Sequence, residues 1–162
     1  MVDGKNILYF IWIVTIVSLF FFIPKSKVRL ALVAFLFQQA LTWPLGLIVV
    51  DMGWIQYPIR FFQNANYASF TFEWFFYPVV SVYFNIYFPE GKSLLAQAAY
   101  YILVCTTLTI IELLILHYTH LIIYIYWSAY LTWITLFSTI YMNRKFCLWF
   151  FKLNSSVVYK GK

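Results

Sequence analysis

The chain has 162 residues, of which 64% are hydrophobic and only 10% are charged. Soluble domains carry about 25% charged residues and need a polar surface, so this composition excludes an ordinary soluble domain and predicts a membrane protein. The net charge of +6 does not indicate nucleic-acid binding, because the basic residues lie beside apolar segments rather than in one patch.

Five apolar segments have about the length of a transmembrane helix, ~17–25 residues. They cover residues 7–23, 30–50, 70–88, 94–116 and 121–141. The predicted fold is therefore all-α, an integral membrane bundle of about five transmembrane helices that forms a single domain over residues 1–152. Only residues 117–120 separate the last two segments, which favours a tight helical hairpin over one long kinked helix.

Both ends of the chain carry weaker signals. No small-residue cleavage site follows the first segment, and basic residues come after it rather than before it, so we expect a retained anchor and not a cleaved signal peptide. Near the carboxyl terminus, apolar residues between cations predict an interfacial helix over residues 143–152. Residues 153–162 are expected to form a short cytoplasmic tail.

The basic residues predict the orientation of the bundle. If five spans alternate, nine basic residues fall on one side: Lys25, Lys27, Arg29, Lys92, Arg144, Lys145, Lys152, Lys160 and Lys162. Only Lys5 and Arg60 fall on the other side. The positive-inside rule then places the amino terminus outside and the carboxyl terminus in the cytoplasm.

Two glutamates, Glu73 and Glu112, lie inside the third and fourth apolar segments. A charge at membrane depth is costly and marks a functional or partnered residue. At 1.5 Å per residue, the predicted orientation places the two carboxylates at matching depth, about 5 Å and ~6 Å from the outer surface. The other members of this candidate polar site come from the neighbouring outer loops: Asp51, Arg60, His117 and His120.

The sequence leaves open what neutralises the negative charges of Glu73 and Glu112. Arg60 could fold over and form an ion pair with them, which would make the site structural; otherwise the carboxylates are available to a ligand. The spacing E-x4-H-x2-H after Glu112 matches no standard helical metal pair, so we predict no metal site. Nucleophile, phosphate-loop and C-x-x-C motifs are absent, so we predict no catalytic residue and no cofactor.

Polar residues recur at helical spacing on the last four segments. They are Gln38, Gln39 and Thr42; Glu73, Tyr77, Ser81 and Asn85; Tyr101, Cys105, Thr109 and Glu112; and Ser128, Thr132, Thr135 and Thr139. Such faces turn toward other helices, either to join them or to line a solvated cavity. Pro44 and Pro78 predict kinks, with the freed backbone carbonyls satisfied by neighbouring helices.

Several short stretches resemble a family of small polytopic membrane proteins from Bacillus-type spore-forming bacteria. They are the run Ile23–Arg29, the loop around Tyr57–Arg60, the entry Ser69–Glu73, and Trp133–Phe137 with Arg144 and Lys145. The resemblance covers residues 23–151 and implies a bacterial plasma-membrane location. The family has no assigned activity, so it implies no catalytic residue.

Three functions are compatible with these patterns. The leading hypothesis is a non-enzymatic component of the lipid bilayer that acts through a membrane-protein or lipid partner. The alternative is a small proton- or cation-coupled transporter that uses Glu73 and Glu112, although the chain lacks the internal repeat common in transporters. The third is an intramembrane enzyme that acts on a lipid-linked substrate through the outer carboxylates and histidines.

Overall fold

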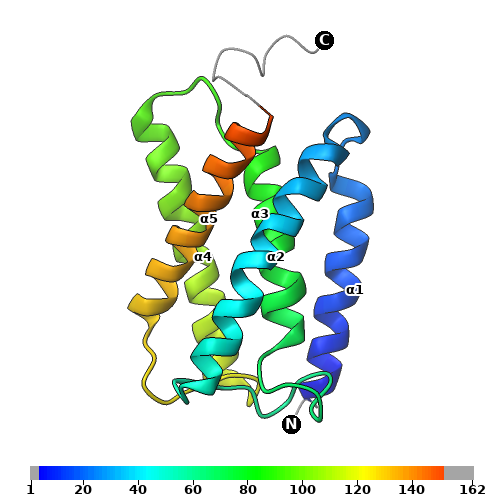
Figure 1. The fold of residues 1–162 in the computed structure, drawn as a ribbon, viewed down its shortest axis with the longest axis vertical. Coiled ribbons are helices and arrows are strands. Elements are labelled where there is room, and N and C mark those ends of the chain that lie inside the picture. The colour runs from blue at the N-terminus through cyan, green and yellow to red at the C-terminus, as the bar shows by residue number, and fades with distance from the viewer. Residues whose placement is uncertain (1–3, 152–162) are drawn as a thin grey trace.

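The computed structural model describes residues 4–151 and contains five α-helices (Figure 1). They are α1 (Gly4–Phe22), α2 (Val28–Asp51), α3 (Tyr77–Ile86), α4 (Leu94–Tyr118) and α5 (Ala129–Phe150). A 3-10 turn, η1 (Lys25–Lys27), precedes α2, and a π-helix, η2 (Phe70–Phe76), leads directly into α3. Two short strands, β1 (Ile55–Gln56) and β2 (Ile123–Tyr124), pair antiparallel, with Ile55 opposite Tyr124. The all-α prediction is confirmed.

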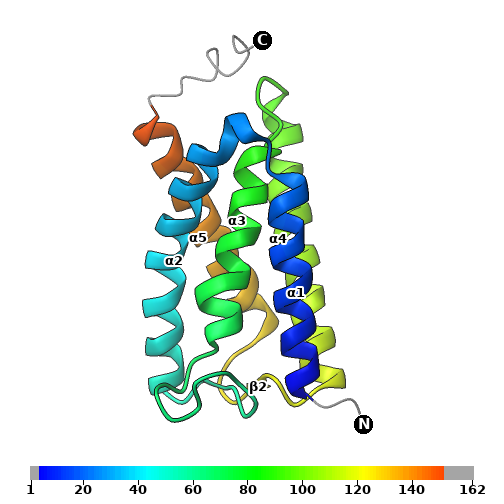
Figure 2. The ribbon, with the colours of Figure 1, turned by 90° about the vertical axis from the view of Figure 1, so that its right-hand side faces the viewer.

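The helices run side by side along one axis (Figures 1 and 2). The α2 helix packs against α3 and α5, α4 packs against α5, and α1 packs against η2. The start of α1, the loop 52–69 and the connector 119–128 lie at one end of the bundle, called the loop end below. The turns 23–27 and 87–93 and the end of α5 lie at the opposite end, called the basic end.

The bundle buries several polar side chains among apolar ones and exposes many large apolar side chains on its exterior. Gln38, Ser81 and Asn143 are at most 1% exposed, whereas Phe20 and Leu94 are more than 80% exposed. A water-soluble protein buries its large apolar side chains and exposes its amides instead. Three helical segments, Gly4–Phe22, Lys25–Asp51 and Leu94–Tyr118, are long and apolar enough to cross a membrane. These features point to a membrane protein.

The region after α4 differs from the prediction. The last helix begins at Ala129 instead of residue 121, because the Ser128 side chain caps it by accepting a hydrogen bond from the Leu131 N–H at 3.4 Å. Leu121 and Ile122 are buried in the connector, packed in one cluster with Leu8 and Phe72. The fourth and fifth helices are therefore separate and joined by the connector 119–128, and they do not form one kinked helix.

The predicted interfacial helix 143–152 is wrong as a separate element. The α5 helix continues without a break to Phe150, because Asn143, Arg144 and Cys147 bury their side chains in the bundle instead of lying on its surface. The expected cytoplasmic tail, residues 153–162, lies outside the described residues.

Candidate functional site

The π-helix η2 positions Glu73. The Ser69 side chain caps its start by accepting a hydrogen bond from the Phe72 N–H at 3.3 Å. Pro78 follows and has no N–H to donate, so carbonyls in the preceding turn need other partners. The Thr42 hydroxyl donates to the Glu73 carbonyl at 2.6 Å, and Gln39 Nε2 donates to the Trp74 carbonyl at 2.9 Å. The prediction that neighbouring helices satisfy carbonyls freed by proline is thus confirmed at Pro78.

A glycine on α2 makes room for the Glu73 side chain. A Cβ atom added to Gly46 would lie 2.6 Å from Glu73 Cγ and 2.9 Å from Cδ. These distances are well below van der Waals contact, so only glycine allows α2 to approach the glutamate this closely.

Glu73 and Glu112 line one small cavity, called the carboxylate cavity below. It has a volume of about 100 Å³ and lies between α2, η2, α3, α4 and α5 near the loop end. Tyr57, Tyr77, Thr132 and other side chains complete the wall, and no Lys, Arg or His lines it among the described residues. The two carboxylates therefore share a site without a cationic side chain.

Glu112 is held by hydroxyl groups from three elements. Tyr77 donates to Oε2 at 2.6 Å, while Tyr124 and Thr132 donate to Oε1, the latter at 2.9 Å. Trp127 Nε1 donates to the Thr132 hydroxyl at 2.8 Å and fixes its position. Because hydroxyl oxygens can also accept a hydrogen bond from a protonated carboxyl group, this arrangement is compatible with both protonation states of Glu112.

Glu73 has fewer partners. Tyr57 donates to Oε1 at 2.9 Å, and no described residue donates to Oε2. Tyr57 belongs to the loop 52–69, and burial together with the adjacent Glu73 charge raises its pKa well above the usual value. Tyr57 therefore stays a neutral hydrogen-bond donor, and Glu73 keeps one oxygen free to bind a proton or a cation.

Arg60 does not neutralise the glutamates. Its guanidinium donates to three backbone carbonyls of its own loop: Asn66 from Nε at 2.8 Å, Tyr57 from Nη1 at 2.8 Å and Gln63 from Nη2 at 3.1 Å. It also lies over the Tyr67 ring. The ion-pair hypothesis for Arg60 is therefore wrong.

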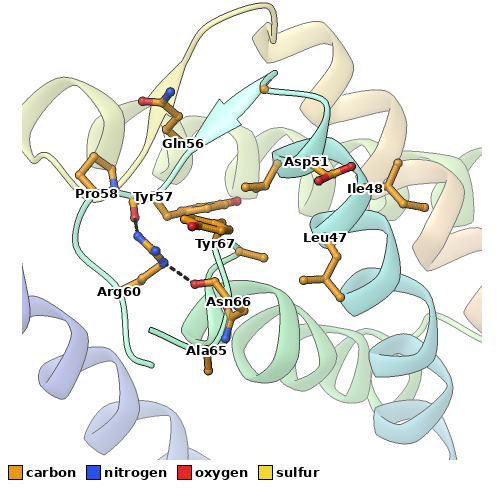
Figure 3. Close-up of a pocket in the computed structure, with 13 residues that line it drawn as sticks. Leu47, Ile48, Asp51, Gln56, Tyr57, Pro58, Arg60, Ala65, Asn66 and Tyr67 are labelled. Carbon is orange, nitrogen blue, oxygen red and sulfur yellow. Dashed lines mark hydrogen bonds between the residues drawn. The ribbon is translucent and has the colours of Figure 1, made fainter. Parts of the chain in front are cut away.

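Arg60 and Asp51 line a second, larger cavity, called the loop groove below (Figure 3). It has a volume of about 860 Å³ and lies between the end of α2 and the loop 52–69. Tyr57 and Val50 line both cavities. Tyr57, only 6% exposed, thus forms part of the wall between the loop groove and Glu73.

The two histidines do not join the site. His117 lies in the last turn of α4 and His120 in the connector, both are exposed, and neither lines the carboxylate cavity. Residues 4–151 hold no group of three or more His, Cys, Asp or Glu side chains that could bind a metal ion.

The polar helix faces divide into two regions. Near the loop end, Tyr77 binds Glu112 within the carboxylate cavity. Farther along, Asn85 Nδ2 donates to Asn143 Oδ1 at 2.9 Å, and Asn143 donates to the Ala34 carbonyl at 2.7 Å. Three other buried members lie along the same faces: Gln38, Ser81 and Thr109. Both uses of polar faces, lining a cavity and joining helices, therefore occur in this bundle.

Sequence reasoning missed several residues of these networks. Tyr57, Tyr124 and Trp127 are held at the carboxylate cavity by loops, and only their aromatic character hinted at a location near a membrane surface. Arg144 is one of the basic residues that predict the orientation, and its burial was not expected: it is 4% exposed, forms an ion pair with Glu90 and lies 4.4 Å from the Phe88 ring centroid. The pair closes the basic end of the bundle.

Comparison of the chain with protein-family models, curated proteins and solved structures found no match.

Proposed function

We propose that the chain is an integral membrane protein whose five helices all cross the bilayer, with the amino terminus outside. The apolar exterior of the bundle and its three long apolar helices support insertion. Among the described residues, the basic end carries six cations, whereas the loop end carries Lys5 and Arg60. The six are Lys25, Lys27, Arg29, Lys92, Arg144 and Lys145. This asymmetry supports a cytoplasmic basic end. The resemblance noted above supports a bacterial plasma membrane.

Aromatic side chains support the same placement. At the loop end, Tyr67, Tyr118 and Tyr126 are at least 75% exposed, and at the basic end Trp149 is 72% exposed. Exposed Tyr and Trp rings gather at the two surfaces of a bilayer, where the ring contacts lipid and its polar atom contacts water. These exposed rings at both ends of the bundle therefore support the proposed positions of the membrane surfaces.

Within this frame, the protein acts as a small proton- or cation-coupled transporter, with Glu73 and Glu112 as the coupling site. The observation that carries this proposal is the shared carboxylate cavity without a cationic side chain. An isolated buried charge costs several kcal/mol, so two adjacent carboxylates require a bound proton, a bound cation or both. A site that must exchange such a charge is suited to couple it to transport.

The other two hypotheses receive less support from the geometry. The enzyme hypothesis needs histidines beside the carboxylates, but His117 and His120 are exposed outside the cavity. Action through a partner protein stays a prediction. Crosslinking in intact membranes would test it, and recovery of the monomer alone would count against it.

Proton flux in liposomes tests the proposal. Purified protein is reconstituted with a pH-sensitive dye inside, the membrane potential is clamped with K⁺ and valinomycin, and a pH step is applied with or without a Na⁺ gradient. We expect the wild type to dissipate the gradient at least tenfold faster than Glu73→Gln or Glu112→Gln.

Thr107→Val, on the exposed side of α4, serves as the control and should retain wild-type flux. Thermal unfolding in detergent establishes that each variant is folded. Equal flux for wild type, both glutamine variants and empty liposomes would overturn the transporter proposal.

A further inference from the structure

We propose that the loop groove binds the headgroup of a zwitterionic aminophospholipid such as phosphatidylethanolamine. Asp51 and Arg60 lie on opposite sides of the Tyr57 and Tyr67 rings in the groove (Figure 3). The volume of about 860 Å³ falls within the ~300–1,000 Å³ range of ligand pockets. This proposal rests on the membrane placement of the bundle and not on cation coupling.

The cationic side of the groove is held in place before any ligand arrives. Arg60 has five N–H donors, and its own loop carbonyls take one from each nitrogen. Two N–H groups remain for a phosphate, which guanidinium groups bind through paired hydrogen bonds. Because the loop already fixes the guanidinium, phosphate binding loses little side-chain entropy.

The anionic side is free. Asp51 ends α2, is exposed, and makes no hydrogen bond or ion pair with another described residue. A primary ammonium group offers three N–H donors to such a carboxylate, whereas the quaternary ammonium of phosphatidylcholine offers none. A headgroup of net negative charge, such as phosphatidylglycerol, would be repelled by Asp51. The charge pattern therefore favours an aminophospholipid.

The apolar wall of the groove fits the rest of a lipid. Leu47 and Ile48 line it from α2 and are 37% and 51% exposed. They continue the apolar exterior of the bundle from the groove toward the bilayer core, along the path that an acyl chain would follow. A soluble headgroup compound could satisfy Asp51 and Arg60 but would leave this wall unused.

Native mass spectrometry of the delipidated protein tests the proposal, with phosphatidylethanolamine, phosphatidylcholine and phosphatidylglycerol added separately at matched chain length. We expect the wild type to bind phosphatidylethanolamine at least threefold more tightly than the other two lipids. Soluble glycerophosphoethanolamine should compete at least tenfold less well than the lipid. Equal affinity for all three lipids, or equal competition by the soluble compound, would overturn the proposal.

Two matched variants test the role of Asp51. Asp51→Asn and Asn64→Lys each raise the charge of the loop end by one, but Asn64 is exposed and does not line the groove. We expect Asp51→Asn to remove the preference for phosphatidylethanolamine over phosphatidylcholine and Asn64→Lys to retain it. The same effect in both variants would indicate general electrostatics and refute the site. Since Glu73→Gln should not alter lipid preference, failure of this proposal is distinguishable from failure of the transporter proposal.

Discussion

Gly46→Ala should destabilise the protein through a direct clash with Glu73. The added Cβ atom would lie 2.6 Å from Glu73 Cγ and 2.9 Å from Cδ, and overpacking of this kind costs about 1–3 kcal/mol. Displacing the carboxylate also breaks its hydrogen bond from Tyr57, which costs about 1–2 kcal/mol more. Alanine gains about 1 kcal/mol over glycine in a helix interior, so we expect a net loss of about 1–4 kcal/mol.

A double-mutant cycle isolates this clash from other effects of the substitution. Glu73→Ala removes Cγ and Cδ, so Gly46→Ala should cost at least ~1 kcal/mol less in that background than in the wild type. Leu36→Ala, at an exposed position of the same helix, should be additive with Glu73→Ala. The measurement is the free energy of unfolding in mixed micelles titrated with denaturing detergent. A Gly46→Ala variant that is more stable than wild type, with no coupling to Glu73, would refute the close approach.

Three further outcomes are expected. Tyr77→Phe should lower the free energy of unfolding by about 1–3 kcal/mol because it removes a donor to the buried carboxylate on α4, while Tyr130→Phe, 83% exposed, should change it little; equal effects would contradict the network. Tyr57 should ionise later than exposed tyrosines because its pKa is raised. The stability that the Tyr57 hydroxyl contributes should therefore be complete below about pH 10, the pKa of tyrosine in the unfolded chain, and should decline above it. Since Tyr57 does not ionise in this range, Tyr57→Phe should leave the tyrosinate absorbance titration between about pH 10 and 11 unchanged. A variant with less tyrosinate absorbance than wild type between about pH 10 and 11 would refute the raised pKa. Glu90→Gln should cost about 3–5 kcal/mol by leaving its arginine partner buried without an ion pair, whereas exposed Lys145→Gln should cost less than about 1 kcal/mol; similar thermal shifts for the two would refute a buried pair.

The apolar periodicity and the charge asymmetry were sufficient to predict most of the helices and the joint location of the glutamates. Glu73 and Glu112 were expected at one depth because basic residues alternate between the turns, and both line the same cavity. The four-residue spacing from Glu73 to Asn85 likewise predicted a face directed at other helices, since hydrogen-bonding side chains avoid lipid.

The loop contributions to the site could not be predicted in the same way. Leu121 and Ile122 are as apolar as membrane-spanning residues, so the sequence does not reveal that they are buried beneath a loop. The position of Tyr124 depends on the pairing of β1 with β2, which links segments almost 70 residues apart. Arg60 binds backbone carbonyls, which carry no side-chain signal in the sequence.

Because of the π-helix, the direction in which Glu73 points is independent of how the following helix, α3, packs in the bundle. A π-helix holds one residue more per turn than an α-helix, so η2 is equivalent to a single-residue insertion that the bundle has absorbed. Deleting one residue between Glu73 and Tyr77 would restore α-helical winding and leave α3 in its present contacts with α2. The glutamate, however, would turn by about 100° around the helix axis. The chain could therefore gain or lose its second carboxylate in one genetic step without rebuilding the bundle.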